Sequence, residues 1–325
     1  MLRRMLGAAA TVAAAFAMAI VADVVPAFAG LGQPSPGQMG LQLPATPVME
    51  HISSLYDIVN WVIIAIAIFV LILMLYVMFR FSEKNNPTPS RTTHNTLLEV
   101  AWTIIPILIL VGISIPSFRL LFEQYSFPKP DLTIKATANA WFWEHEFLDQ
   151  KVTITSNVIS DEDVLTAKMG EKEFNAKYGA LEGVARHRAT YQDSAAVWAE
   201  RKDLRKLTVD QEIAVPVNKV VHLLVTSNDV IHSWTIPSFG AKMQAVPGRT
   251  SAVWFKPTIV GSYHGQCSVL CGKLHSAMPI VVRVVEQPVY DAWMAALQAK
   301  DKKKAQGILK ADADSQVSRT IATAQ

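Results

Sequence analysis

Both cysteines of this 325-residue chain lie in one short stretch, CSVLCGKLHSAM, at residues 267–278. Its sulfur and nitrogen side chains, those of Cys267, Cys271, His275 and Met278, follow the spacing C-x3-C-x3-H-x2-M. Thiolates, imidazoles and thioethers are soft or borderline metal ligands. The stretch is therefore a candidate metal-binding loop.

A disulfide, a pair of inert buried thiols and a zinc site are the simpler interpretations of the two cysteines. Four-residue spacing closes a disulfide only in a cooperative loop shape, and so small a loop stabilises little. Zinc sites usually show C-x-x-C or C-x-x-x-x-C pairs and no methionine. Met278 discriminates between these interpretations, because a thiolate together with a thioether selects copper, whereas imidazole suits several metals.

An upstream histidine extends the ligand series. His232 lies in NDVIHSW, and a mononuclear blue-copper site needs one cysteine, one histidine on each side of it in the chain, and an axial methionine. Because a second cysteine is present, two thiolates could bridge two copper ions, with the carbonyl of Val269 and Met278 as weak axial ligands. Such a closed site favours electron transfer over bond-making catalysis. By contrast, His222 in VVHLLVT is expected to be a core or surface residue.

The candidate loop lies in a region whose pattern predicts an all-β sandwich at residues 128–287. Short segments rich in Val, Ile and Thr, separated by Pro and Gly, are expected to be strands at 132–137, 152–156, 220–226, 250–255 and 280–285. A charged stretch at about 160–206 is interpreted as a helical or partly disordered surface insertion rather than a second core. Residues 288–325 are expected to form one amphipathic helix and a Lys-rich, solvated tail.

Two uncharged apolar runs, at residues 61–79 and 100–118, precede the β region. With their flanks each reaches the ~20 residues that cross a bilayer, which predicts a transmembrane hairpin with helices at 57–80 and 97–121. The connector, loop 81–96 with the adjoining Arg80, contains Arg80, Lys84 and Arg91, whereas residues 30–56 contain no Lys or Arg. The positive-inside rule then predicts a cytoplasmic loop, with both termini and the β domain in the periplasm.

The first 29 residues have the pattern of a secretory signal peptide. Arg3 and Arg4 precede an Ala-rich apolar run and an A-x-A site, so we expect cleavage after Ala29. A short anchor that is retained is the alternative. With either alternative, the rest of the chain is exported or membrane-bound, in an oxidising compartment. Together with the two spans this predicts a protein of the bacterial inner membrane, and no nucleic-acid partner is expected.

In its longer motifs the sequence resembles subunit II of haem–copper cytochrome c oxidases. The matching stretches are NTLLEVAWTIIP (95–106), WFWEHEF (141–147), NDVIHSWTIPSFGAKMQAVPGR (228–249) and YHGQCSVLCGKLHSAMPIVV (263–282). The resemblance implies a cupredoxin-like sandwich with a dinuclear copper centre, CuA, whose ligands are His232, Cys267, Cys271, His275, Met278 and the main-chain carbonyl of Val269. It also implies that electrons from cytochrome c pass through CuA to haem in subunit I, where oxygen is reduced to water and protons are pumped. The chain alone is expected to catalyse nothing.

The resemblance implies further roles outside the copper loop. Trp141 would be the residue through which electrons enter, whereas Phe142 and Trp143 are expected in the core or at the membrane interface. Glu99 is either the mouth of a proton pathway or a side chain that reaches the membrane surface. Four carboxylates either form a negative docking patch for a basic cytochrome or are simply solvated; they are Glu144, Glu146, Asp149 and Asp229.

Two departures from the family pattern place a second metal site in doubt. Val269 stands where the family usually has a Glu that reaches a magnesium ion shared with subunit I, and Gln244 stands where an Asp is common.

Three other kinds of protein share part of this sequence pattern. A copper chaperone of the Sco type has one membrane anchor and a distant histidine, and a quinol oxidase subunit has lost the copper ligands. The copper loop alone does not exclude a CuA-containing reductase that acts on nitrogen oxides, but the E-x-x-W-T-x-x-P and WFW segments favour the oxidase.

Overall fold

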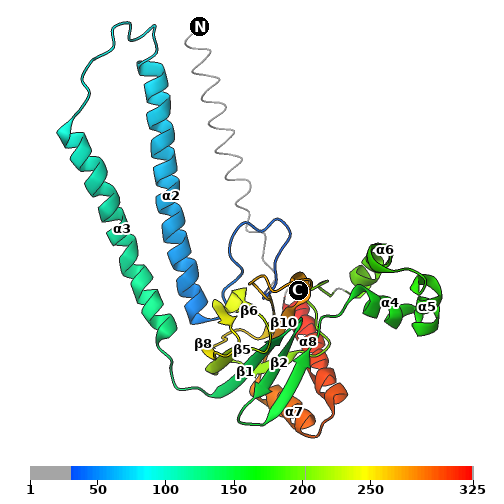
Figure 1. Cartoon of the computed structure of the whole chain (residues 1–325). Coiled ribbons are helices and arrows are strands. Elements are labelled where there is room, and N and C mark those ends of the chain that lie inside the picture. Colours follow the sequence, from blue (N-terminus) through cyan, green and yellow to red (C-terminus); the bar gives the residue numbers. More distant parts are fainter. Residues whose placement is uncertain (1–30, 202, 324–325) are drawn as a thin grey trace.

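The computed structural model describes residues 31–201 and 203–323, so the predicted signal peptide and its cleavage site lie outside the described residues. Two long helices, α2 (Pro47–Arg80) and α3 (Thr96–Tyr125), lead into a β domain (Figure 1). Both are long and apolar enough to cross a membrane. The side chain of Thr46 caps the start of α2, which explains why this helix begins well before the apolar run.

The β domain consists of a five-stranded sheet, a three-stranded sheet and a two-stranded hairpin. Their strand orders are β3-β2-β1-β5-β8, β4-β10-β9 and β6-β7. Alternate residues of β1 are buried, as expected for a strand with one face on the core. The predicted fold class, a two-helix hairpin followed by a β sandwich, is confirmed. The strands are β1 (Leu132–Asn139), β2 (Phe142–Phe147), β3 (Val152–Ser156), β4 (Ile213–Pro216), β5 (Val221–Ser227), β6 (His232–Ile236), β7 (Ala241–Ala245), β8 (Ser251–Phe255), β9 (Gly261–Gln266) and β10 (Pro279–Val285).

The charged insertion forms three helices, α4 (Asp161–Met169), α5 (Glu171–Tyr178) and α6 (Gly183–Arg201). The expectation that it has no core of its own was wrong. Each helix carries only two to four buried residues, too few for a clear apolar pattern in the sequence, but together they pack as one small cluster. Its members are Val164, Leu165, Phe174, Tyr178, Val197 and Trp198.

The C-terminal segment also differs from the prediction. The amphipathic helix α7 (Gln287–Gln298) is followed by a second helix, α8 (Lys302–Thr323), where a solvated tail was expected. Ala305 and Leu309, four residues apart on one face of α8, are buried in the main core. The neighbouring lysines at 302–304 are exposed and dominate the local composition, which is why the sequence suggested a solvated tail.

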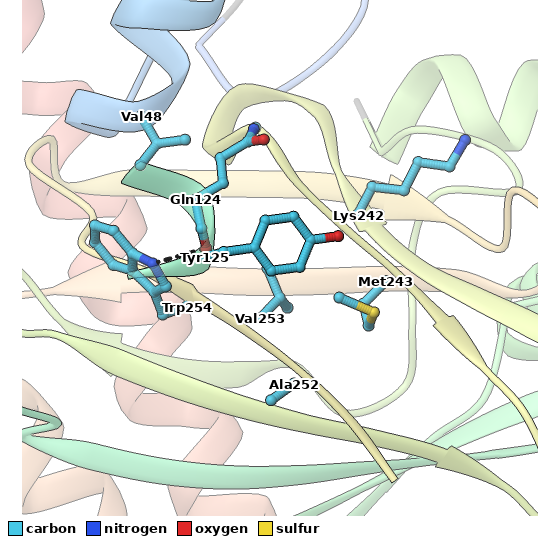
Figure 2. Close-up of a pocket in the computed structure, with 9 residues that line it drawn as sticks. Val48, Gln124, Tyr125, Lys242, Met243, Ala252, Val253 and Trp254 are labelled. Carbon is cyan, nitrogen blue, oxygen red and sulfur yellow. Dashed lines mark hydrogen bonds between the residues drawn. The ribbon is translucent and has the colours of Figure 1, made fainter. Parts of the chain in front are cut away.

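Several contacts fix the β domain on the ends of α2 and α3. Figure 2 shows the indole of Trp254, whose Nε1 donates a 3.2 Å hydrogen bond to the carbonyl oxygen of Gln124. The Nε2 of His222 lies 2.7 Å from the carbonyl oxygen of Pro128. This ring nitrogen therefore has a hydrogen-bond partner, as expected for a core or surface residue. Gly240 has φ +63°, and a Cβ there would lie 2.6 Å from Cδ1 of Ile52 on α2, so glycine allows the close approach.

Candidate metal centre

The candidate loop is closed at its base by the sheet. Strand β9 leads directly into Cys267, and β10 begins directly after Met278. Because β9 and β10 pair antiparallel, the amide of Cys267 donates to the carbonyl of Met278 at 3.0 Å. The two ends of the loop, 11 residues apart in the chain, are therefore held side by side.

The two thiols face each other without a covalent bond. Their Sγ atoms are 3.7 Å apart, and both cysteines are free and buried. Two sulfurs bound to one tetrahedral ion at about 2.3 Å lie roughly 3.7 Å apart, so the spacing fits a shared metal. Burial and the neighbouring Cys267 raise the pKa of the Cys271 thiol to about 12. A bound cation favours the thiolate and so acts against this shift.

Each cysteine has an imidazole beside it. The Nδ1 of His232 is 3.9 Å from Sγ of Cys267, and the Nδ1 of His275 is 3.5 Å from Sγ of Cys271. A sulfur and a nitrogen on the same tetrahedral ion are separated by roughly 3.5 Å, so both pairs are near ligating geometry. The ligand atoms of His232, Cys267 and Cys271 all lie within 4.8 Å of one another.

Asp229 orients the upstream histidine. Its Oδ1 is 2.8 Å from Nε2 of His232, and its carboxylate also accepts from the amides of Val230 and Ala140, each at 2.6 Å. Burial would raise the pKa of Asp229, but the hydrogen bonds from His232 and these amides hold it below its usual value. The carboxylate therefore favours the tautomer with the proton on Nε2, which leaves Nδ1 free to face Cys267.

The two predicted axial ligands lie at opposite ends of the loop. The carbonyl oxygen of Val269 is 3.2 Å from Sγ of Cys267. Met278 is fully buried and belongs to the core cluster that also contains both cysteines. The donor set of this loop together with His232 on β6, two thiols, two imidazoles, a carbonyl and a thioether, fits copper chemistry.

Trp141 lies directly on the candidate loop. Its indole Nε1 donates a 3.1 Å hydrogen bond to the carbonyl oxygen of Cys271. The next residue, Gly272, has φ +114°, and a Cβ there would be 3.3 Å from Cζ2 of Trp141, so glycine permits the contact. Trp143 is fully buried, as predicted for a core residue, with its ring centroid 6.2 Å from that of His232.

Two contacts of this site were not predicted. One is the hydrogen bond from Nε2 of His232 to the carboxylate of Asp229, although an Asp three residues before a candidate ligand is a signal that could have suggested it. The other is a contact between the C-terminal end of the insertion and the candidate loop. There, Nζ of Lys206 is 3.5 Å from Oγ of Ser276. No short-range sequence pattern marks this contact, since it joins residues 70 positions apart.

The remaining predicted residues lie on elements other than the candidate loop. Glu99 is in the first turn of α3, whereas the β domain follows the far end of that helix (Figure 1). Glu144 and Glu146 lie on the same half-exposed face of β2, and Asp149 is exposed. Gln244 is exposed on β7.

Comparisons with known proteins identify the same family over most of the chain. Residues 34–120 match the family described as cytochrome c oxidase subunit II, transmembrane domain, and residues 190–285 match its periplasmic domain. Cytochrome c oxidase subunit 2 of Cereibacter sphaeroides is 39% identical over 269 residues, 81% of this chain and 82% of that protein. The probable subunit 2 of Rickettsia bellii is 37% identical over 281 residues, 86% and 90% of the two chains.

A solved structure is also similar. It is the periplasmic domain of subunit II of cytochrome oxidase (CoxB) of Bradyrhizobium japonicum, which is 35% identical, covers 54% of this chain and 99% of its own, and gives a TM-score of 0.41.

Proposed function

The chain belongs to the cytochrome c oxidase subunit II family, and from this premise we propose that it accepts electrons from cytochrome c at a dinuclear copper centre and passes them to haem in subunit I. The observation that carries the proposal is the pair of free thiols 3.7 Å apart, each with an imidazole nitrogen within 4 Å. A disulfide would not require the two imidazoles. A single tetrahedral ion would need only the two thiols and the two imidazoles, whereas the carbonyl oxygen of Val269 also lies 3.2 Å from Sγ of Cys267.

The residues that would hold the copper are His232, Cys267, Cys271, His275, Met278 and the main-chain carbonyl of Val269. When bound, the metal pair supplies a one-electron carrier. The protein's part is to hold the ligands rigid, because a site that barely rearranges transfers an electron with little reorganisation. The sheet that closes the loop, the buried core around the thiols and the Asp229–His232 hydrogen bond all serve this rigidity.

Electrons would enter through Trp141, whose hydrogen bond to Cys271 links the protein surface to the loop. They would leave near His275, which is half-exposed at the outer end of the loop. In the proposed ligand set every position is filled by the protein, so oxygen reduction would belong to subunit I. We expect no catalysis from this chain alone.

Proton pumping and membrane orientation extend the same proposal. The oxidase would lie in the bacterial inner membrane, with the loop after Arg80 in the cytoplasm and both termini in the periplasm. Glu99, at the start of α3 beside that loop, would then lie at the cytoplasmic surface, where a proton pathway into subunit I could begin.

A magnesium ion shared with subunit I is expected to bind weakly or not at all. The side chain of Val269 has no donor atom, and Gln244 offers a neutral amide in place of a carboxylate, whereas magnesium prefers carboxylate and water oxygens. A tightly held, stoichiometric magnesium or manganese ion in the purified oxidase would contradict this expectation.

Copper content tests the central proposal. The purified full-length chain should bind two copper ions, and Cys271→Ser should lose this stoichiometry. Ser276→Ala in the same loop removes no ligand and should keep it. Full copper binding by the Cys271→Ser variant would show that the two thiols do not share the metal.

A further inference from the structure

A pocket of about 210 Å³ lies between α2 and α3, near the ends that join the β domain. We propose that this pocket binds the headgroup and glycerol region of an anionic phospholipid from the outer leaflet. The proposal does not depend on the copper chemistry, because it rests on the two membrane helices; the choice of leaflet rests on the membrane orientation proposed above. The pocket is lined by His51, Ser54, Leu55 and Ile58 of α2 and by Pro116, Arg119, Leu120 and Glu123 of α3.

The depth of the pocket matches that of lipid headgroups. The uncharged run of α3 ends at Phe118, and Arg119 is the first charged residue after it. On α2, Asp57 is the last charged residue before the uncharged run. A headgroup layer is about 5–8 Å thick, or roughly four to five residues of helix. The pocket therefore spans the boundary between hydrocarbon and headgroups.

The lining changes polarity along the membrane normal in the direction that a phospholipid requires. Ile58 and Pro116 lie nearest the hydrocarbon, whereas His51 and Glu123 lie at the outer end, with Nδ1 and Oε2 only 2.7 Å apart. His51 therefore binds Glu123, which is the one carboxylate that lines the pocket. An acyl-glycerol region would contact the apolar end, and a phosphodiester would lie toward the polar end.

Arg119 supplies the charge complementarity. Its guanidinium forms no hydrogen bond or salt bridge with any residue within 31–201 and 203–323. A guanidinium is suited to bidentate contact with phosphate oxygens and is often found at such sites. At about 210 Å³ the pocket is smaller than the ~300–1,000 Å³ of sites that enclose whole ligands, so the acyl chains would remain in the bilayer.

A second pocket, of about 160 Å³, lies where the helices meet β7 and β8 and contains Lys242 (Figure 2). It is a poorer candidate for the same ligand. Tyr125 in its wall is seven residues beyond Phe118, which places it roughly 10 Å outside the hydrocarbon and beyond the headgroup layer.

Native mass spectrometry of the full-length chain in detergent, titrated with dioleoylphosphatidylglycerol, tests the proposal. The wild-type chain should bind one lipid that Arg119→Gln weakens by about tenfold, the effect expected from one charge-assisted hydrogen bond. Ser54→Trp, which fills the pocket and keeps every charge, should weaken the same lipid. Arg80→Gln, at the other end of α2, removes an equal charge outside the pocket and should bind as the wild type does.

Three results would overturn the proposal. One is equal lipid binding by the wild type and both pocket variants, with helix content unchanged by circular dichroism. Another is displacement of the lipid by millimolar inorganic phosphate, which would indicate a simple anion site. The third would come from the complete oxidase: Arg119 cross-links to another subunit, and Arg119→Gln changes the binding of no phospholipid.

Discussion

The indole Nε1 of Trp141 donates a 3.1 Å hydrogen bond to the carbonyl oxygen of Cys271. This bond joins a partly exposed aromatic side chain to the main chain of a candidate copper ligand. In the proposed function it would give an electron arriving at the surface a short covalent and hydrogen-bonded route to the two thiols.

Trp141→Phe should therefore slow the oxidation of cytochrome c by the complete oxidase by about tenfold or more, equivalent to at least ~1.4 kcal/mol of activation free energy. The copper spectrum should not change, because no ligand is removed. Trp198→Phe is a matched control, since that indole also donates a hydrogen bond, to Asp161, but lies in the insertion. A wild-type rate in Trp141→Phe would exclude this route.

Asp229→Asn should weaken copper binding, because the amide no longer enforces the Nε2-protonated tautomer of His232. Loss of such a partner of a metal ligand typically costs about 10–100-fold in affinity. Asp149→Asn removes an exposed carboxylate of the proposed docking patch and should leave copper affinity unchanged. Competition with a copper chelator measures both, and equal affinities would show that Asp229 does not position the ligand.

His145 predicts a pH dependence of stability. Its side chain is buried, Nε2 lies 3.2 Å from the indole Nε1 of Trp234, and burial lowers its pKa to about 3. In the unfolded chain the pKa is about 6.5, so between pH 6.5 and 3 only the unfolded state takes up this proton. The free energy of unfolding should fall by up to ~1.4 kcal/mol per pH unit as pH decreases through this window.

Chemical denaturation at several pH values measures this effect. His145→Gln should reduce the slope between pH 6.5 and 5, above the range in which most carboxylates titrate, whereas His187→Gln, at an exposed position in the insertion, should not. Identical slopes in the wild type and His145→Gln would mean that His145 is hydrated or mobile enough to titrate normally.

Local patterns were sufficient to predict much of this protein. Uncharged runs marked both membrane helices, and five strands lie within two residues of their predicted bounds, because apolar content and β-branched residues act locally. The C-x3-C-x3-H-x2-M series placed the candidate ligands in one loop because a loop of 12 residues keeps its members close whatever the rest of the fold does.

Features that depend on distant partners were not predicted. The small core of the insertion is shared among three helices, so no single helix shows it, and Leu309 is buried only because α8 folds back on the sandwich. Asp229 was interpreted as a docking or solvated carboxylate, because its position three residues before His232 permits the contact but does not require it. The contact of Lys206 with Ser276 likewise exists only in the folded chain.

The electron paramagnetic resonance spectrum of the full-length chain, purified without its partner subunits and loaded with copper, tests the central claim most directly. We predict hyperfine splitting from two equivalent copper nuclei that share one unpaired electron, since in the proposed site the two thiols and two histidines hold a metal pair. A spectrum from a single copper nucleus, or a protein that binds no copper because Cys267 and Cys271 form a disulfide, would contradict it.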